Sequence, residues 1–190
     1  MTSKSTSLIG ILLAISSFTS AAHDKQTQPN ILLLVAEDMS AHVKAFGDDI
    51  AITPNIDALA AKSILYPNSF TTAGVCAPSR TGLITGVHQA SVGGQHMRTR
   101  DYKKSAYRAV PSEEIKAFPE LLRKNGYYTY VSSKLDYQFS GITANSGPFT
   151  IWDYEGSKPS WKGRKPNQPF FGMYHFNISH ESALFPDKIA

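Results

Sequence analysis

The chain has 190 residues, which is enough for one domain with a hydrophobic core and short for two. Hydrophobic residues make up 42% and charged residues 18%, so the composition is that of a globular protein and excludes an intrinsically disordered one. The formal net charge is +4, and the single cysteine excludes an intramolecular disulfide.

The first residues have the pattern of a secretory signal peptide. Lys4 supplies the positive charge, residues 8–15 an apolar run, and Ser20-Ala21-Ala22 a cleavage site of small residues. We therefore expect a signal peptide at residues 1–22 and an exported protein, periplasmic or secreted. The apolar run is too short to span a bilayer, so no membrane anchor is expected. Residues 23–190 would form one domain.

The first predicted element of that domain is a strand at residues 31–36. Its continuous apolar run is typical of a strand buried on both faces, as in a parallel sheet covered by helices. Glu37-Asp38 ends the run. Thr53-Pro54 then predicts a helix start, with Thr53 as the N-cap and Pro54 at the first helical position. Apolar residues follow at helical spacing, namely Ile56, Leu59, Ala60 and Ile64.

The later elements continue this alternation of helices and strands. A second helix is expected at residues 78–85, closed by Gly86 as its C-cap, and a third from Pro119 to Asn125-Gly126. Strands are expected at residues 127–132 and 169–176, before and after a long connection at residues 140–168. Alternating strands and helices predict an α/β fold with a mainly parallel sheet flanked by helices.

Three groups of polar residues lie directly after predicted strands, namely Glu37-Asp38, Lys134 and His180. In parallel sheets, ligands bind outside the carboxyl ends of the strands. We therefore expect these residues to meet in a single active site.

The paired carboxylates of Glu37 and Asp38 suit a hard cation such as Ca²⁺ or Mg²⁺, which prefers oxygen ligands. The alternative is a solvated acidic turn. Taken alone, the pair favours the turn.

Cys76 precedes a predicted helix, whose free backbone N–H groups and positive dipole end favour an anion. As a thiolate it would be a nucleophile, which makes a cysteine hydrolase one alternative. A lone cysteine is otherwise usually a small buried hydrophobic residue.

Residues 76–86 read Cys-Ala-Pro-Ser-Arg-Thr-Gly-Leu-Ile-Thr-Gly. This stretch resembles the sulfatase signature, C-x-P-S-R followed by T-G. Residues 29–38, from Pro-Asn-Ile to Ala-Glu-Asp, resemble the family's P-N-I…A-D-D segment, with Glu37 in place of the first Asp. The resemblance implies the alkaline-phosphatase-like fold of the formylglycine-dependent (type I) sulfatases.

The resemblance also implies roles for single residues. Cys76 would be oxidised to formylglycine by a formylglycine-generating enzyme, and its aldehyde hydrate would be the nucleophile. Arg80 would hold the hydrate. Ca²⁺ or Mg²⁺ would bind at Glu37, Asp38 and position 76.

Two further segments carry part of the family pattern. Residues 132–136 resemble the G-K-x-H segment, which makes Lys134 a sulfate contact and puts Asp136 in place of the histidine. Asp136 would be a general base or merely structural. Residues 176–180 resemble F-x-x-P-H, so that His180 would contact the sulfate and protonate the leaving alcohol.

The resemblance runs from about residue 29 to residue 181 and corresponds to the first part of the family's catalytic domain. The second pair of metal ligands lies beyond that part, so we expect an N-terminal fragment or a truncated product. The implied function is a sulfuric ester hydrolase that releases sulfate from a sulfate ester, with a sulfated polysaccharide as the candidate substrate. The alternatives are an inactive fragment or binding module, and a phosphonate or phosphodiester hydrolase of the same superfamily.

Residues 97–108 are rich in basic residues, with tyrosines among them. A nucleic-acid patch, a groove for anionic sugars and a solvated basic face all fit this pattern. The solvated face is favoured, and no nucleic-acid partner is expected. Of the other histidines, His88, His96 and His175 are interpreted as core or surface residues.

Overall fold

The computed structural model describes residues 28–97, 107–141, 145–147 and 149–185. The expected signal peptide and most of the basic segment lie outside these residues. The helices and strands follow in the order β1 (Ile31–Ala36), α1 (Pro54–Ala60), α2 (Cys76–Thr85), α3 (Phe118–Lys124), β2 (Tyr128–Ser132), β3 (Tyr154–Gly156) and β4 (Phe170–Phe176). Short 3-10 helices are η1 (Lys44–Phe46), η2 (Gln89–Val92), η3 (Trp161–Gly163) and η4 (Glu181–Leu184).

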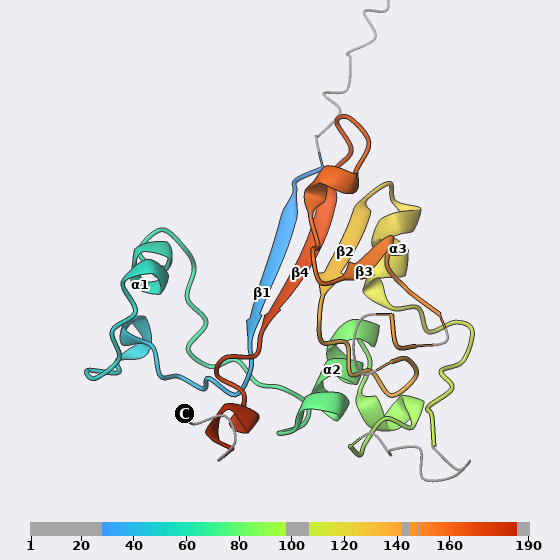
Figure 1. Cartoon of the computed structure of the whole chain (residues 1–190). Coiled ribbons are helices and arrows are strands. Elements are labelled where there is room, and N and C mark those ends of the chain that lie inside the picture. Colours follow the sequence, from blue (N-terminus) through green and yellow to red (C-terminus); the bar gives the residue numbers. More distant parts are fainter. Residues whose placement is uncertain (1–27, 98–106, 142–144, 148, 186–190) are drawn as a thin grey trace, which may run out of the picture.

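The strands form one sheet in the order β1-β4-β2-β3, and all three pairings are parallel. This confirms the predicted α/β fold with a parallel sheet. In Figure 1, β1, β4 and β2 run in the same direction, so that their carboxyl ends lie together at the lower edge of the sheet, near α2. That edge is where polar residues from different strands can meet.

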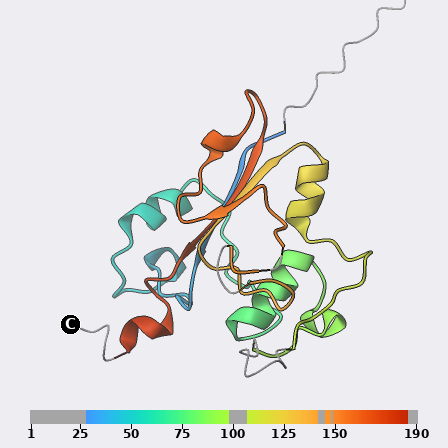
Figure 2. The ribbon, with the colours of Figure 1, turned by 45° about the vertical axis from the view of Figure 1, so that its right-hand side comes forward.

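The hydrophobic core lies on the side of the sheet where α2 and α3 pack (Figure 2). Side chains alternate between the two faces of a strand, so β1 and β4 each supply every second residue to this core. The core joins Ile84 of α2 to Val131 of β2 and to Phe171 and Met173 of β4. Leu122 of α3 packs against the same cluster. The core thereby fixes the position of α2 relative to the strand ends.

The expectation that the first strand is buried on both faces is wrong. Leu33 and Val35 pack against the core, but Leu32 and Leu34 on the opposite face are 50% and 53% exposed. The register pairs Leu34 with Tyr174 at the edge of the described sheet. β1 has one strand neighbour there, β4, and the core covers only one of its faces.

The predicted helix starting at Thr53-Pro54 is present but short. The side chain of Thr53 makes no cap bond; instead its Oγ1 accepts a hydrogen bond from Lys44 N and donates one to Asp57. Two turn hydrogen bonds, Lys62 N to Leu59 O and Ser63 N to Ala60 O, end the helix. Ile64 therefore lies beyond it, with its side chain 78% exposed.

The other predicted elements agree with the structure within one or two residues. α2 begins at Cys76 and is closed by Gly86, whose φ of 69° is in the left-handed region that favours glycine. α3 ends at Lys124 with Asn125 as its C-cap, within one residue of the expected end. The short strand β3 lies within the stretch that was expected to be a long connection. No helix of the described residues is both long and apolar enough to cross a membrane.

Candidate active site

Helix α2 places Cys76 at its first turn, facing the carboxyl ends of the strands. Val75, the residue before it, is extended, and the buried residues Ala77, Pro78 and Thr81 hold the helix in the core. The first N–H groups of a helix have no partner within the helix, and its positive dipole end lies there. Position 76 is therefore suited to a group that reacts with an anion.

A buried ion cluster lies one helical turn after Cys76. Arg80 Nη2 donates to Glu37 Oε1, and Lys134 Nζ donates to Glu37 Oε2 at 2.9 Å. The side chains of Arg80 and Glu37 are only 6% and 5% exposed. Burial lowers the pKa of Arg80, but an arginine beside a carboxylate stays charged. The structure thus brings together three residues that the sequence placed after β1, on α2 and after β2.

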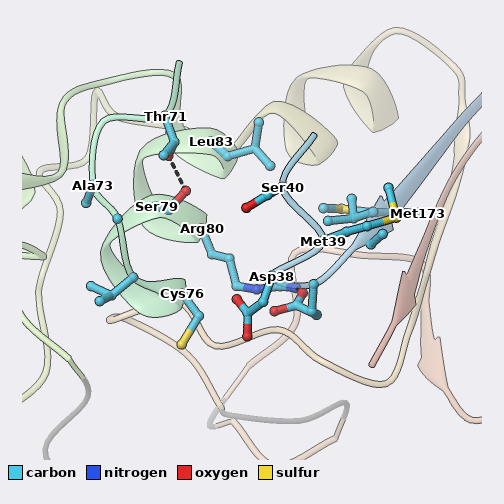
Figure 3. A pocket seen from close by; sticks show the side chains of 15 residues that line it. Asp38, Met39, Ser40, Thr71, Ala73, Cys76, Ser79, Arg80, Leu83 and Met173 are labelled. Atoms are coloured by element: carbon cyan, nitrogen blue, oxygen red, sulfur yellow. Dashed lines mark hydrogen bonds and ion pairs between the residues drawn. The ribbon is translucent and has the colours of Figure 1, made fainter. Parts of the chain in front are cut away.

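Asp38 faces Cys76 across a pocket of about 520 Å³. Figure 3 shows the side chains of Cys76 and Arg80 extending from α2 toward Asp38. Asp38 Oδ2 accepts a hydrogen bond from the backbone N–H of Glu181 at 3.0 Å. The backbone φ of Asp38 is 49°, an uncommon value that turns the chain out of β1.

The donor set at this pocket fits a divalent cation only in part. Oxygen donors of the kind that Ca²⁺ and Mg²⁺ prefer are present at Glu37 and Asp38. However, both carboxylate oxygens of Glu37 are paired with cations. Among the described residues, no group of three or more His, Cys, Asp and Glu side chains is arranged to hold a metal ion.

Asp136 lies beside Cys76, where the sequence pattern of the family has a histidine. Burial, followed by the hydrogen bond and the charge of Asp136, raises the pKa of the Cys76 thiol, against the opposing charge of Lys134. At neutral pH, Cys76 is therefore a thiol and a weak nucleophile.

His180 lies close to the site, but its ring is turned elsewhere. The segment that carries it is bound to the end of β1, because Ser179 Oγ donates to the carbonyl of Glu37. The Nδ1 atom of His180 contacts Ser182 Oγ at 2.9 Å and accepts from Ser182 N at 3.2 Å. Cys76, Arg80 and Asp38 line the pocket, and His180 does not.

His175 is a neighbour of the site that sequence reasoning missed. The sequence favours a core or surface histidine at this position, and His175 is indeed 7% exposed. Its Nε2 atom, however, lies 2.9 Å from Arg80 Nη1. The sequence could have predicted which way His175 points. Residues 171, 173 and 175 alternate along the strand, so His175 lies on the same face as Phe171 and Met173, the face that packs against α2.

Some of the non-glycine residues with positive φ follow β1 and β2. Asp38, Ser133 and Asp136 are non-glycine residues with φ of 49°, 47° and 57°. Such conformations cost energy and cluster at functional sites. Ser133 occupies the position at which the family pattern has glycine, the residue that adopts this backbone without strain.

The other basic and histidine residues lie away from this pocket or outside the described residues. Arg98, Arg100, Lys103 and Lys104 are outside them, so the interpretation of the basic segment stays a prediction. Arg108, at its end, is exposed. His88 is exposed as well, as expected for a surface histidine.

Comparisons with known proteins agree on one family. A family model described as Sulfatase matches residues 29–156. The chain is 43% identical over 162 residues to an ulvan-active sulfatase of Formosa agariphila, covering 83% of this chain and 26% of that protein. It is 33% identical over 155 residues to iduronate 2-sulfatase of Mus musculus, covering 78% of this chain and 26% of that protein. The chain thus spans about a quarter of the length of these relatives.

Among solved structures, one in complex with its substrate D-glucosamine-2-N,6-O-disulfate matches with a TM-score of 0.60 at 20% identity. The match covers 81% of this chain and 35% of that one. At this identity the likeness supports the fold.

Proposed function

Because this chain belongs to the sulfatase family, we propose that the protein hydrolyses sulfate esters with a nucleophile made from Cys76. The observation that carries the proposal is the position of Cys76, at the first turn of α2 in a pocket that Arg80 and Asp38 also line. Arg80 and Lys134 share the carboxylate of Glu37, so the cluster adds one net positive charge beside it. A helix N-terminus next to a net positive charge favours a sulfate group.

The nucleophile is proposed to be formylglycine at position 76, made by a formylglycine-generating enzyme. The aldehyde hydrate would supply one hydroxyl whose oxygen bonds to sulfur while the bond from sulfur to the alcohol oxygen breaks. Its second hydroxyl would then lose a proton, which rebuilds the carbonyl and expels sulfate. An unmodified thiol lacks this second hydroxyl. The raised pKa of Cys76 also makes the thiol itself a poor nucleophile.

The side chains of this chain bind the anion and move protons. Arg80 and Lys134 bind the sulfate oxygens and stabilise the charge that develops on them. Asp136, beside position 76, accepts the hydrate proton. His180 protonates the leaving alcohol. To do so, its ring gives up the hydrogen bond to Ser182 and bonds to the substrate oxygen instead.

A divalent cation, Ca²⁺ or Mg²⁺, is proposed at Glu37, Asp38 and position 76. Asp38 directs its carboxylate into the pocket (Figure 3). Glu37 can act as a ligand only if one of its ion pairs, with Arg80 or Lys134, opens. Such an ion would attract the sulfate ester by its charge.

The proposed substrate class is a sulfated polysaccharide. The ulvan-active sulfatase and the solved complex with a disulfated glucosamine support this class. Export to the periplasm or the medium, through the signal peptide at residues 1–22, would bring the protein to such a substrate.

Turnover of matched esters by the full-length protein tests the proposal. We expect release of sulfate from an aryl sulfate with Ca²⁺ present, slower release of phosphate from the matching aryl phosphate, and no release by Cys76→Ala. Faster phosphate release would favour the phosphodiester or phosphonate alternative. Equal sulfate release by Cys76→Ala would contradict the proposed nucleophile, and no turnover by the wild type would favour the inactive alternative.

A further inference from the structure

The ring of His175 lies between one group that can only accept a hydrogen bond and another that can only donate one. Its Nδ1 atom is 3.1 Å from the carbonyl oxygen of Ser132, which can only accept a hydrogen bond. Its Nε2 atom is 2.9 Å from Nη1 of Arg80, which can only donate. The proton must therefore be on Nδ1, and Nε2 must be an acceptor. The ring is neutral in this arrangement.

The backbone around the ring reinforces this orientation. The N–H of His175 donates to Ser132 Oγ at 3.0 Å, so Ser132 at the end of β2 holds the residue by both its backbone and its ring. Burial, followed by the charge of Arg80, lowers the pKa of His175 to about 4. The neutral form therefore persists throughout the neutral pH range.

The two terminal nitrogens of Arg80 bond to neighbours of different charge. Nη2 donates to the Glu37 carboxylate, and Nη1 donates to His175 and, at 3.4 Å, to the Lys134 carbonyl. A neutral acceptor fixes the direction of the guanidinium group without offsetting its charge beyond what Glu37 already does. A carboxylate in place of His175 would fix it equally well but would weaken its attraction for an anion.

We propose that His175 is a positioning residue for Arg80: its neutral imidazole, oriented by Ser132, accepts the Nη1 proton and holds the guanidinium toward position 76. The proposal rests on the proposed sulfatase function for its catalytic consequence, but the contact itself does not depend on that function. His175 touches neither substrate nor nucleophile in this role. It acts only through the geometry of Arg80.

The contact is tested by NMR of the full-length protein labelled with ¹⁵N-histidine. The His175 signals are those that disappear in His175→Phe or, if that variant does not fold, in His175→Gln. We expect a neutral ring with its proton on Nδ1 from pH 8 to pH 5.5. A proton on Nε2, or an imidazolium at pH 5.5, would overturn the proposal whether or not the protein hydrolyses sulfate esters.

The consequence is tested by kinetics. His175→Phe keeps a ring but loses the acceptor, and we expect kcat/KM for an aryl sulfate to fall about 10- to 100-fold, because a misplaced catalytic group and an unpaired buried donor are each costly. His175→Gln restores an acceptor and should recover most of that loss. Tyr174→Phe, on the opposite face of the same strand, should change kcat/KM less than about twofold. Equal losses in the Phe and Gln variants, with both folded, would contradict a positioning role.

Discussion

Arg80 of α2 and Glu37 at the end of β1 form a buried ion pair that links the helix carrying Cys76 to the sheet. Arg80 lies one helical turn after Cys76, so the pair also orients the first turn of α2. Lys134, after β2, donates to the second oxygen of Glu37 at 2.9 Å. One carboxylate therefore joins three separate parts of the chain at the edge where the substrate is proposed to bind.

Glu37→Gln should destabilise the protein strongly. The change leaves the buried Arg80 and the partly buried Lys134 without their carboxylate, and breaking a buried pair in this way costs about 3–5 kcal/mol. Urea unfolding should show this loss in the free energy of unfolding. Arg123→Gln is the control, because its ion pair with Asp153 is partly exposed and should be worth less than about 1 kcal/mol. A Glu37→Gln variant as stable as the control would show that the cluster adds nothing to the fold.

The stability of the wild type should fall in acid because of His175. Its folded pKa of about 4 lies below the ordinary value of 6.5, so the unfolded chain takes up the proton first as the pH falls. The stabilisation is complete above pH 6.5 and is lost between pH 6.5 and pH 4, by roughly 3 kcal/mol. The neighbouring cations Arg80 and Lys134 act in the same direction as burial.

The measurement is the free energy of unfolding of wild type and of His175→Gln from pH 7.5 to pH 4. The difference between the two curves isolates His175 from the acidic residues, which titrate in both proteins. Parallel curves would mean that His175 is not held in its neutral form.

Ca²⁺ should stabilise the wild type, and Asp38→Asn should remove that effect. A ligand that binds only the folded state raises its stability by an amount that grows with the ligand concentration. The measurement is the shift in Tm between excess Ca²⁺ and a chelator. Asp49→Asn, a change of an exposed carboxylate that does not line the pocket, should keep the wild-type shift. A full shift in Asp38→Asn would remove Asp38 from the proposed metal site.

Ser133→Gly should stabilise the fold. The φ of Ser133 is 47°, a conformation that costs a residue with a Cβ atom roughly 1–2 kcal/mol. Part of this gain is offset because glycine loses more entropy on folding, so we expect a net gain of about 0.5–1 kcal/mol in thermal or urea unfolding. Ser133→Ala keeps the Cβ atom and should gain nothing. A loss of stability in Ser133→Gly would mean that the serine side chain outweighs the strain.

Much of the fold could be predicted from local patterns. The apolar run at residues 31–36, the Thr53-Pro54 pair and Gly86 as a C-cap each mark an element that the structure contains. The gathering of Glu37 and Lys134 at one edge was also predictable, because parallel strands end on the same side of a sheet.

What local patterns could not predict depends on contacts between distant residues. His175 and Arg80 are 95 positions apart, and only the packing of α2 on β4 brings them together. The exposure of Leu34 on β1 depends on what covers each face of the sheet, which an apolar run does not reveal. The strand β3 has only three residues, too few for a period of two to stand out.

The most direct test of the proposed nucleophile is a mass spectrum of the peptide that contains Cys76, from protein purified from its native host. We expect residue 76 to be present as the formylglycine aldehyde or its hydrate in a large share of the molecules. A peptide that carries only the unmodified Cys76 thiol would contradict the proposed mechanism.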